Sequence, residues 1–352
     1  MKLKKQKSFL IDLLHKSSLN LLLRRRIEEE VRKKGTYARG LLQQNIKNNS
    51  MQNLKHQLIL AGFILLAGAN SLISQNKMEE EKFKGKVRSV SVTKTPQTGK
   101  EEERIIYKNG ITFNEQGKKT GTWMEIGSGV MDGKSTFSYD ANGNLLECLG
   151  YSGGNPNGKQ TYKYDAKKQL TEKQDFYGDG KLNEKISYSY DEKGMLITEM
   201  KYDENEKLKY KNVYTYNEKA WCTQQQEYMY ETLYDVYTNK YDANGNLTEV
   251  KFHTYITDTD VKDYTANTKY DTEGRWIENS QINEKGKLVT RTSATYDAMG
   301  NQVSYTEYTP DGKIKEKNTN TFEYDKTGNW IKQSYFTNGK LVSVTVREFM
   351  YF

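Results

Sequence analysis

The stretch Tyr-Asp-Ala-Asn-Gly-Asn-Leu occupies residues 139–145 and recurs without a change at residues 241–247. Looser copies of the same stretch fill most of the chain between and after these two. Self-similarity at a period of roughly 25 to 29 residues is typical of a repeat array, in which each unit contacts its neighbours. The looser copies begin at Tyr164, Tyr190, Tyr216, Tyr270, Tyr296 and Tyr324.

Each copy has the pattern of a strand followed by a tight turn. Residues 186–190 read Ile-Ser-Tyr-Ser-Tyr, and such alternation is the period-two pattern of a half-buried strand. The Asp that follows the Tyr can accept a hydrogen bond from a backbone N–H two residues on, and a Gly three residues later closes a type I turn. The matching pairs are Asp140 with Gly143, Asp191 with Gly194, Asp242 with Gly245, Asp271 with Gly274, Asp297 with Gly300, and Asp325 with Gly328.

A large apolar residue follows the Gly by two positions in most copies, as at Leu145 and Leu196, and pins the register of the return strand. A second turn, such as Asp179-Gly180, comes about half a period later. One period is therefore two strands and two turns. We predict an all-β fold, an array of antiparallel hairpins or meanders at residues 105–352 that forms an extended, curled sheet or β-spiral, with a helical N-terminal segment around residues 18–31.

The composition favours an ordered chain over a disordered one. Only 35% of the 352 residues are hydrophobic, and the mean hydropathy is -0.92. The chain nevertheless contains 27 tyrosines and only three prolines. A disordered chain lacks such an aromatic content, and tyrosines can bury their rings while the hydroxyl stays near water.

The net charge of +8 is concentrated at the N-terminus. Residues 1–50 contain 13 Lys and Arg against four acidic residues, and Lys55 adds one more charge, so the rest of the chain is close to neutral at −2. A near-neutral repeat region has no basic surface for a phosphate backbone. We therefore expect no nucleic-acid partner.

The first 75 residues have two interpretations. Residues 1–50 are either a genuine basic extension, or they precede the true start at Met51; the second is favoured because residues 51–75 have the order of an export signal. Lys55 precedes an apolar core at residues 58–69, which is too short to span a bilayer and ends in small residues suited to cleavage. We expect a secreted, periplasmic or cell-surface protein with no stable membrane span after cleavage, and a charged spacer with the first strand at residues 76–104.

The Tyr-Asp-x-x-Gly-Asn-Leu copies resemble those of the RHS or YD-repeat family, over roughly residues 105–352. The resemblance implies a long antiparallel sheet that curls into a spiral or shell, export, and often binding to carbohydrate or the cell surface. Many family repeats carry Arg after the Gly, whereas here only Gly274-Arg275 does. The family's toxin-enclosing shells are several times longer, and the chain is more similar to small exported repeat proteins of Bacteroidetes-type bacteria.

Residues that could carry catalysis are few. Gly150-Tyr151-Ser152-Gly153-Gly154 matches the G-x-S-x-G nucleophile elbow, which requires a strand-to-helix turn and a partner His. The surroundings are hairpins, and the only His beyond the export signal is His253, so a glycine-rich loop accounts better for this stretch. We predict that the protein is not an enzyme.

Metal and disulfide chemistry is equally sparse. Asp258, Asp260 and Asp263 could gather oxygen ligands for calcium, but the Gly and terminal Glu of a recognised loop are missing, so a solvated acidic turn is favoured. We predict no cofactor. Cys148 and Cys222 hold different positions in their repeats, and both a disulfide and two free thiols remain open.

The aromatic residues allow two interpretations. Trp276 and Trp330 stand where other copies have Leu, and Trp221 falls one position earlier in its copy, which favours packing within the sheet. The alternative is that these Trp residues, with Tyr188 and Tyr214, form a platform on which sugar rings stack. We predict a non-enzymatic protein that binds a glycan or a surface protein at the cell envelope. The alternatives are a structural remnant of a toxin-delivery shell and a hydrolase that uses Ser152.

Overall fold

The computed structural model describes residues 83–99, 106–126, 131–255 and 261–352. The chain divides into Met1–Glu79 and Glu80–Phe352, and the fold described below belongs to the second unit. The described part consists of strands and turns without a helix, so it holds no helix that could cross a membrane. The basic extension, the export signal and the expected N-terminal helix lie outside the described residues.

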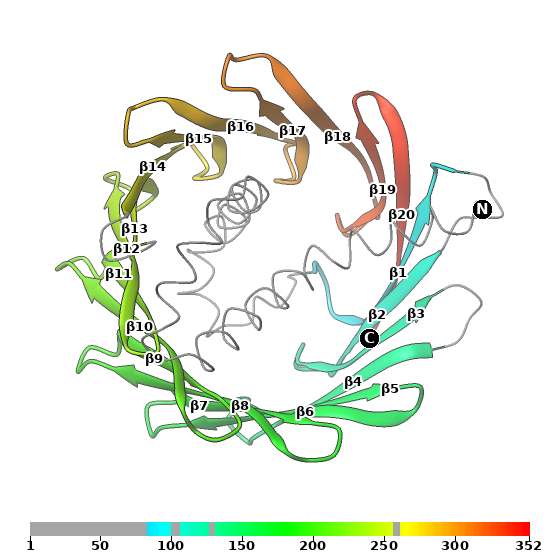
Figure 1. Ribbon diagram of the computed structural model, residues 1–352. Coiled ribbons are helices and arrows are strands. Elements are labelled where there is room, and N and C mark those ends of the chain that lie inside the picture. Colours follow the sequence, from blue (N-terminus) through cyan, green and yellow to red (C-terminus); the bar gives the residue numbers. More distant parts are fainter. Residues whose placement is uncertain (1–82, 100–105, 127–130, 256–260) are drawn as a thin grey trace, which may run out of the picture. The chain divides into compact units, whose positions relative to one another are not determined.

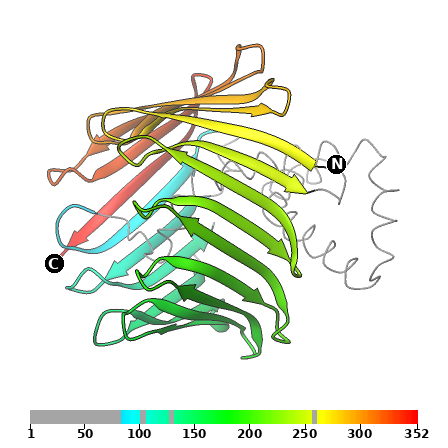
Figure 2. The same ribbon diagram turned by 90° about the vertical axis from the view of Figure 1, so that its left-hand side faces the viewer.

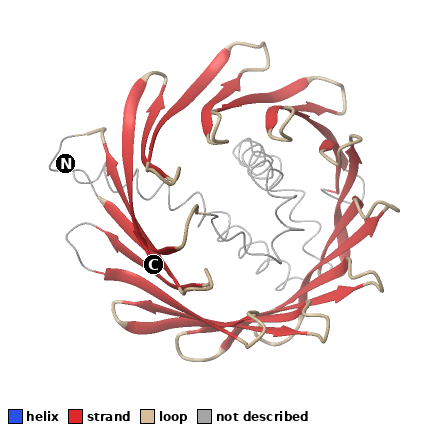
Figure 3. Cartoon of the chain, turned by 180° about the vertical axis from the view of Figure 1, so that it is seen from behind, coloured by secondary structure: helices blue, strands red, loops and turns tan. Residues whose placement is uncertain are grey.

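Twenty strands form one closed antiparallel sheet (Figures 1 and 3). Each strand pairs with the next one along the chain, so neighbouring arrows in Figure 2 run in opposite directions. The strands are β1 (Val87–Pro96), β2 (Tyr107–Phe113), β3 (Lys119–Ile126), β4 (Met131–Tyr139), β5 (Leu145–Ser152), β6 (Asn155–Tyr164), β7 (Leu170–Tyr177), β8 (Leu182–Tyr190), β9 (Leu196–Tyr202), β10 (Leu208–Tyr216), β11 (Cys222–Met229), β12 (Thr232–Tyr241), β13 (Leu247–Tyr255), β14 (Val261–Tyr270), β15 (Trp276–Asn283), β16 (Leu288–Tyr296), β17 (Gln302–Tyr308), β18 (Ile314–Tyr324), β19 (Trp330–Thr337) and β20 (Lys340–Tyr351).

The prediction of an extended, curled sheet or β-spiral is wrong, because the two ends of the sheet meet. Strand β1 pairs with β20 over nine residue pairs, from Val87 with Tyr351 to Pro96 with Ser343. The backbone N–H of Phe352 also donates to the carbonyl of Lys86, at 3.0 Å. Closure satisfies the backbone groups that an open sheet leaves unpaired at its two edges. The sequence pattern did not show this seam, because β1 carries no Tyr-Asp copy.

The predicted turn chemistry is confirmed. Oδ1 of Asp140 accepts hydrogen bonds from the backbone N–H groups of Asn142 and Asn144, both at 2.8 Å. Gly143 adopts a φ of 82°, which an L-residue rarely adopts. The same arrangement recurs along the chain, and positive φ angles occur at Gly194, Gly245, Gly274, Gly300 and Gly328.

One copy places a lysine where most others place glycine, and this gives a stability prediction. Lys168 has a φ of 64°, a left-handed conformation that costs a non-glycine residue about 1–2 kcal/mol. Because glycine also loses more backbone entropy on folding, we expect Lys168→Gly to stabilise the protein by about 0.5–1 kcal/mol in urea denaturation. The neighbouring Lys167→Gly is the control, and an equal gain there would show that φ at residue 168 is not the cause.

Consecutive repeats are joined through the tyrosine of the motif. The hydroxyl of Tyr216 donates to the backbone carbonyl of Leu196 at 2.8 Å, and Leu196 is the apolar residue that opens the preceding return strand. The motif therefore couples two repeats: its apolar residue supplies the acceptor, and the Tyr of the next copy supplies the donor. Equivalent bonds join Tyr164 to Leu145, Tyr190 to Leu170, Tyr241 to Cys222, Tyr270 to Leu247 and Tyr296 to Trp276.

The two faces of the sheet differ in character. One face, here called the tyrosine face, carries Tyr188, Tyr214 and Tyr237, whose pKa values are all raised by desolvation. The opposite face, here called the ion-pair face, carries cross-strand pairs whose lysines are well exposed, such as Lys240 with Glu249 at 2.9 Å. The tyrosine face is therefore the more desolvated of the two.

Candidate binding pocket

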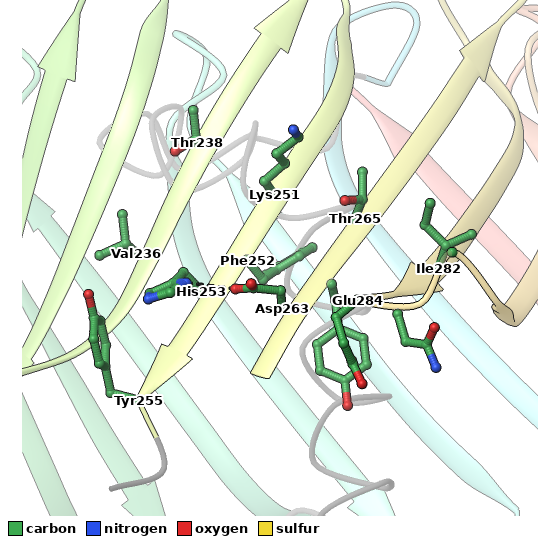
Figure 4. Close-up of a pocket in the computed structure, with 13 residues that line it drawn as sticks. Val236, Thr238, Lys251, Phe252, His253, Tyr255, Asp263, Thr265, Ile282 and Glu284 are labelled. Atoms are coloured by element: carbon green, nitrogen blue, oxygen red, sulfur yellow. Dashed lines mark hydrogen bonds and ion pairs between the residues drawn. The ribbon is translucent and has the colours of Figure 1, made fainter. Parts of the chain in front are cut away.

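A pocket of about 610 Å³ lies over strands β12 to β15 (Figure 4). Strand register brings its residues together in two rows. Val236, His253 and Asp263 stand opposite one another on β12, β13 and β14. Thr238, Lys251 and Thr265 form the adjacent row. Both rows belong to the ion-pair face, because successive side chains of a strand point to opposite sides and Lys251 and His253 lie two and four residues after Glu249.

A hydrogen-bonded pair lies in the middle of the pocket. Nδ1 of His253 is 2.6 Å from Oδ1 of Asp263, and the carboxylate accepts the hydrogen bond. The ring of Tyr255 packs edge-on against the imidazole, with ring centroids 4.6 Å apart. Tyr255 is 36% exposed, so part of its ring remains open to a ligand. Three polar or aromatic groups from two strands thus meet at one point of the surface.

Two further charged residues of the pocket are not engaged. Lys251 and Glu284 are exposed and make no hydrogen bond or ion pair within the part of the chain that the structure describes. Glu284 follows β15 directly and lies near Tyr264, whose pKa is raised by burial and by this neighbouring carboxylate. The pocket therefore offers an ammonium donor and a carboxylate acceptor that the fold itself does not use.

The aromatic residues predicted as a platform lie elsewhere and are packed against neighbours. Trp221 packs on Tyr241, with ring centroids 5.3 Å apart, and the guanidinium of Arg347 lies 3.5 Å from the ring centre of Trp330. Trp276 lies edge-on to Tyr305 at 6.3 Å. Tyr188 and Tyr214 belong to a core cluster with Leu196 and Cys222. None of the five lines the pocket, and their role in sugar binding stays a prediction.

The remaining candidates are placed as follows. Ser152 ends β5, and Gly153 and Gly154 form a two-residue turn into β6, which is not a strand-to-helix turn. Cys148 and Cys222 are free thiols. Asp258 and Asp260 lie outside the described residues, and Asp263 faces His253. Within the described ranges, no group of three or more His, Cys, Asp or Glu side chains is placed to hold a metal ion.

The repeat pattern leaves His253 as an isolated side chain and does not mark Lys251, Tyr255 or Glu284 as residues of a site. A signal for part of the site was present. A hairpin centred near residue 258 pairs residue 253 with residue 263, as the structure shows. Placing the imidazole beside the Asp263 carboxylate therefore required only the hairpin register, whereas the contribution of Glu284 required the next strand as well.

Comparisons with known proteins give distant matches only. No family model and no curated protein matches the sequence. Among solved structures, the chain is similar to TcdB2-TccC3 without its hypervariable C-terminal region, at 13% identity and a TM-score of 0.36, covering 69% of this chain and 15% of that one. It is also similar to a porin-like protein from Bacteroides uniformis, at 12% identity and a TM-score of 0.32, covering 75% of this chain and 96% of that one. A LolA superfamily protein from Nitrosomonas europaea matches at 9% identity and a TM-score of 0.20, covering 80% of this chain and 91% of that one.

Proposed function

We propose that the protein is an exported, non-enzymatic repeat barrel that binds a glycan at the cell envelope or outside the cell, through the pocket over β12 to β15. The observation that supports this most is the grouping of a half-exposed tyrosine ring with several polar side chains in one open pocket. Ligand sites commonly combine an aromatic or apolar floor with a few well-placed polar groups.

The chemistry of a sugar ring suits this grouping. The apolar face of a pyranose packs on an aromatic ring, and its hydroxyls both donate and accept hydrogen bonds. Tyr255 supplies the ring, Asp263 and Glu284 supply acceptors, and Lys251 supplies a donor. The tight pairing of His253 with Asp263 holds one acceptor in place before a ligand arrives, which lowers the entropy lost on binding.

Loss of the tyrosine ring is the direct test of this proposal. We expect Tyr255→Ala to weaken glycan binding about tenfold or more, because an aromatic contact contributes on the order of 1 kcal/mol beyond the area that it buries. Oligosaccharides that bind the unmodified protein on a glycan array would be titrated against both forms by calorimetry.

The matched control is Tyr177→Ala. Tyr177 ends β7, is 49% exposed and does not line the pocket, so its loss should leave affinity unchanged. Equal losses in both variants, or glycan binding that survives Tyr255→Ala, would contradict the assignment of the pocket. Capture of an envelope protein with no glycan binding would contradict the glycan as ligand.

A further inference from the structure

The pocket carries more acidic than basic character, and the excess is concentrated on one side. Its lining carries two carboxylates, Asp263 and Glu284, against one ammonium group, Lys251. Tyr264 of β14 pairs with Asn283 of β15, and this register brings the preceding Asp263 next to the following Glu284. Figure 4 shows the Asp263 carboxylate directed toward His253 and the Glu284 side chain on the neighbouring strand side, with Lys251 further along β13.

The two carboxylates are not equivalent. Asp263 is held by His253 at 2.6 Å, whereas Glu284 makes no hydrogen bond or ion pair among the described residues. The unengaged carboxylate of Glu284, with Asp263 on the neighbouring strand, attracts a cation and repels an anion. The face of the Tyr255 ring, at the other end of the row, also favours cations. Lys251 lies in the neighbouring row, so it offsets this field only in part.

We infer that the pocket selects amine-bearing sugars over neutral ones, and neutral sugars over acidic ones. This rests on the proposed function. A free amino group on a sugar ring would lie close to the unengaged carboxylate of Glu284, while a uronic acid would bring another carboxylate to the same place. Like charges brought together at an interface disfavour the wrong partner, so the discrimination arises as much from repulsion as from attraction.

The experiment compares three oligosaccharides of equal length on the intact chain: a glucosamine oligomer, an N-acetylglucosamine oligomer and a galacturonic acid oligomer. We expect the amine-bearing oligomer to bind about tenfold more tightly than the neutral one, and the acidic oligomer to bind most weakly. Raising salt from 50 to 500 mM should reduce the preference for the amine, because the attraction between exposed charges is screened.

The variant Glu284→Gln removes one charge and keeps the size of the side chain. It should lower the ratio between amine-bearing and neutral oligomers several-fold and leave binding of the neutral oligomer nearly unchanged. Glu273→Gln, in the turn before β15 and outside the pocket, is the control. Tightest binding of the acidic oligomer, or a preference unaffected by Glu284→Gln, would overturn this inference alone. If none of the three oligomers bound the unmodified protein more tightly than it bound the Tyr255→Ala variant, the proposed function itself would be contradicted.

Discussion

We expect Val90→Asp to destabilise the protein by about 3–5 kcal/mol, because it places an unpaired charge in the core of the seam. Val90 is only 1% exposed and lies in β1 opposite Phe349 of β20. It forms a core cluster with Val87 and Phe113, against which the ring of Phe83 packs. Loss of the seam would also leave two unpaired strand edges, so the variant should aggregate on heating. Urea denaturation and light scattering would measure the two effects.

The control for this substitution is Val346→Asp, which introduces the same charge into the other seam strand. Val346 lies opposite Thr93 and is 39% exposed, so water solvates the new carboxylate. We expect a change within about 0.5 kcal/mol. Similar losses in the two variants would contradict a core at the β1–β20 seam, since burial is the main difference between them.

The second large effect concerns an acid on the tyrosine face. Burial raises the pKa of Asp235 to about 6, despite hydrogen bonds from neighbouring side chains that lower it, and Glu227 adds to the rise. Tyr237 is one of the neighbours, and its hydroxyl donates to Oδ2 of Asp235 at 3.3 Å. We expect Asp235→Asn to stabilise the protein by on the order of 1–3 kcal/mol at pH 7.5.

The dependence on pH follows from the direction of the shift. The folded-state pKa lies above the ordinary value of 3.8 for an aspartate, so the folded protein binds the proton more tightly than the unfolded chain does. The native Asp235 therefore costs stability as pH rises from about 4 to 6, and the full cost is present above pH 6. The advantage of Asp235→Asn should disappear near pH 4, and a gain that persists at pH 4 would contradict the desolvation argument.

A turn aspartate, Asp140, has a pKa that is shifted in the opposite direction, so its replacement should have the opposite effect on stability. The hydrogen bond from the backbone N–H of Asn144 lowers the pKa of Asp140 below the ordinary value of 3.8 for an aspartate. Its carboxylate therefore stabilises the fold above that value, and this contribution is lost as pH falls. Asp140→Asn should lose stability at neutral pH, whereas Asp235→Asn should gain it. The same substitution thus separates turn aspartates from buried ones.

The repeat pattern predicted the strands and turns well, because these depend on neighbours within one period. Asp140 and Gly143 are close in sequence, so their chemistry alone indicates the turn. The closure of the sheet was not predictable in this way. It depends on the sum of twist and stagger over all twenty strands, and on a seam strand, β1, that lacks the Tyr-Asp copy.

The residues of the pocket also differ in how far they could be predicted from neighbours in the sequence. His253 and Asp263 belong to one hairpin and could have been paired from the sequence, whereas Glu284 comes from the next hairpin. The tryptophans stand out in the sequence because of their size, but Trp330 is covered by Arg347 from a neighbouring strand. The rare tryptophans therefore mark packed positions in the sheet. The pocket is lined by common residue types, such as Lys251, which do not stand out in the sequence.

The seam has a consequence for the order of the chain. The side-chain amide of Asn329 makes two hydrogen bonds to the backbone of Lys84: Nδ2 donates to the carbonyl, and Oδ1 accepts from the N–H. The last Tyr-Asp turn is thus bonded to the segment that precedes β1. A ring of this kind has no first member. A variant in which Phe352 is linked to Lys84 and the chain is opened at another tight turn, such as Tyr230-Glu231, should therefore form the same barrel.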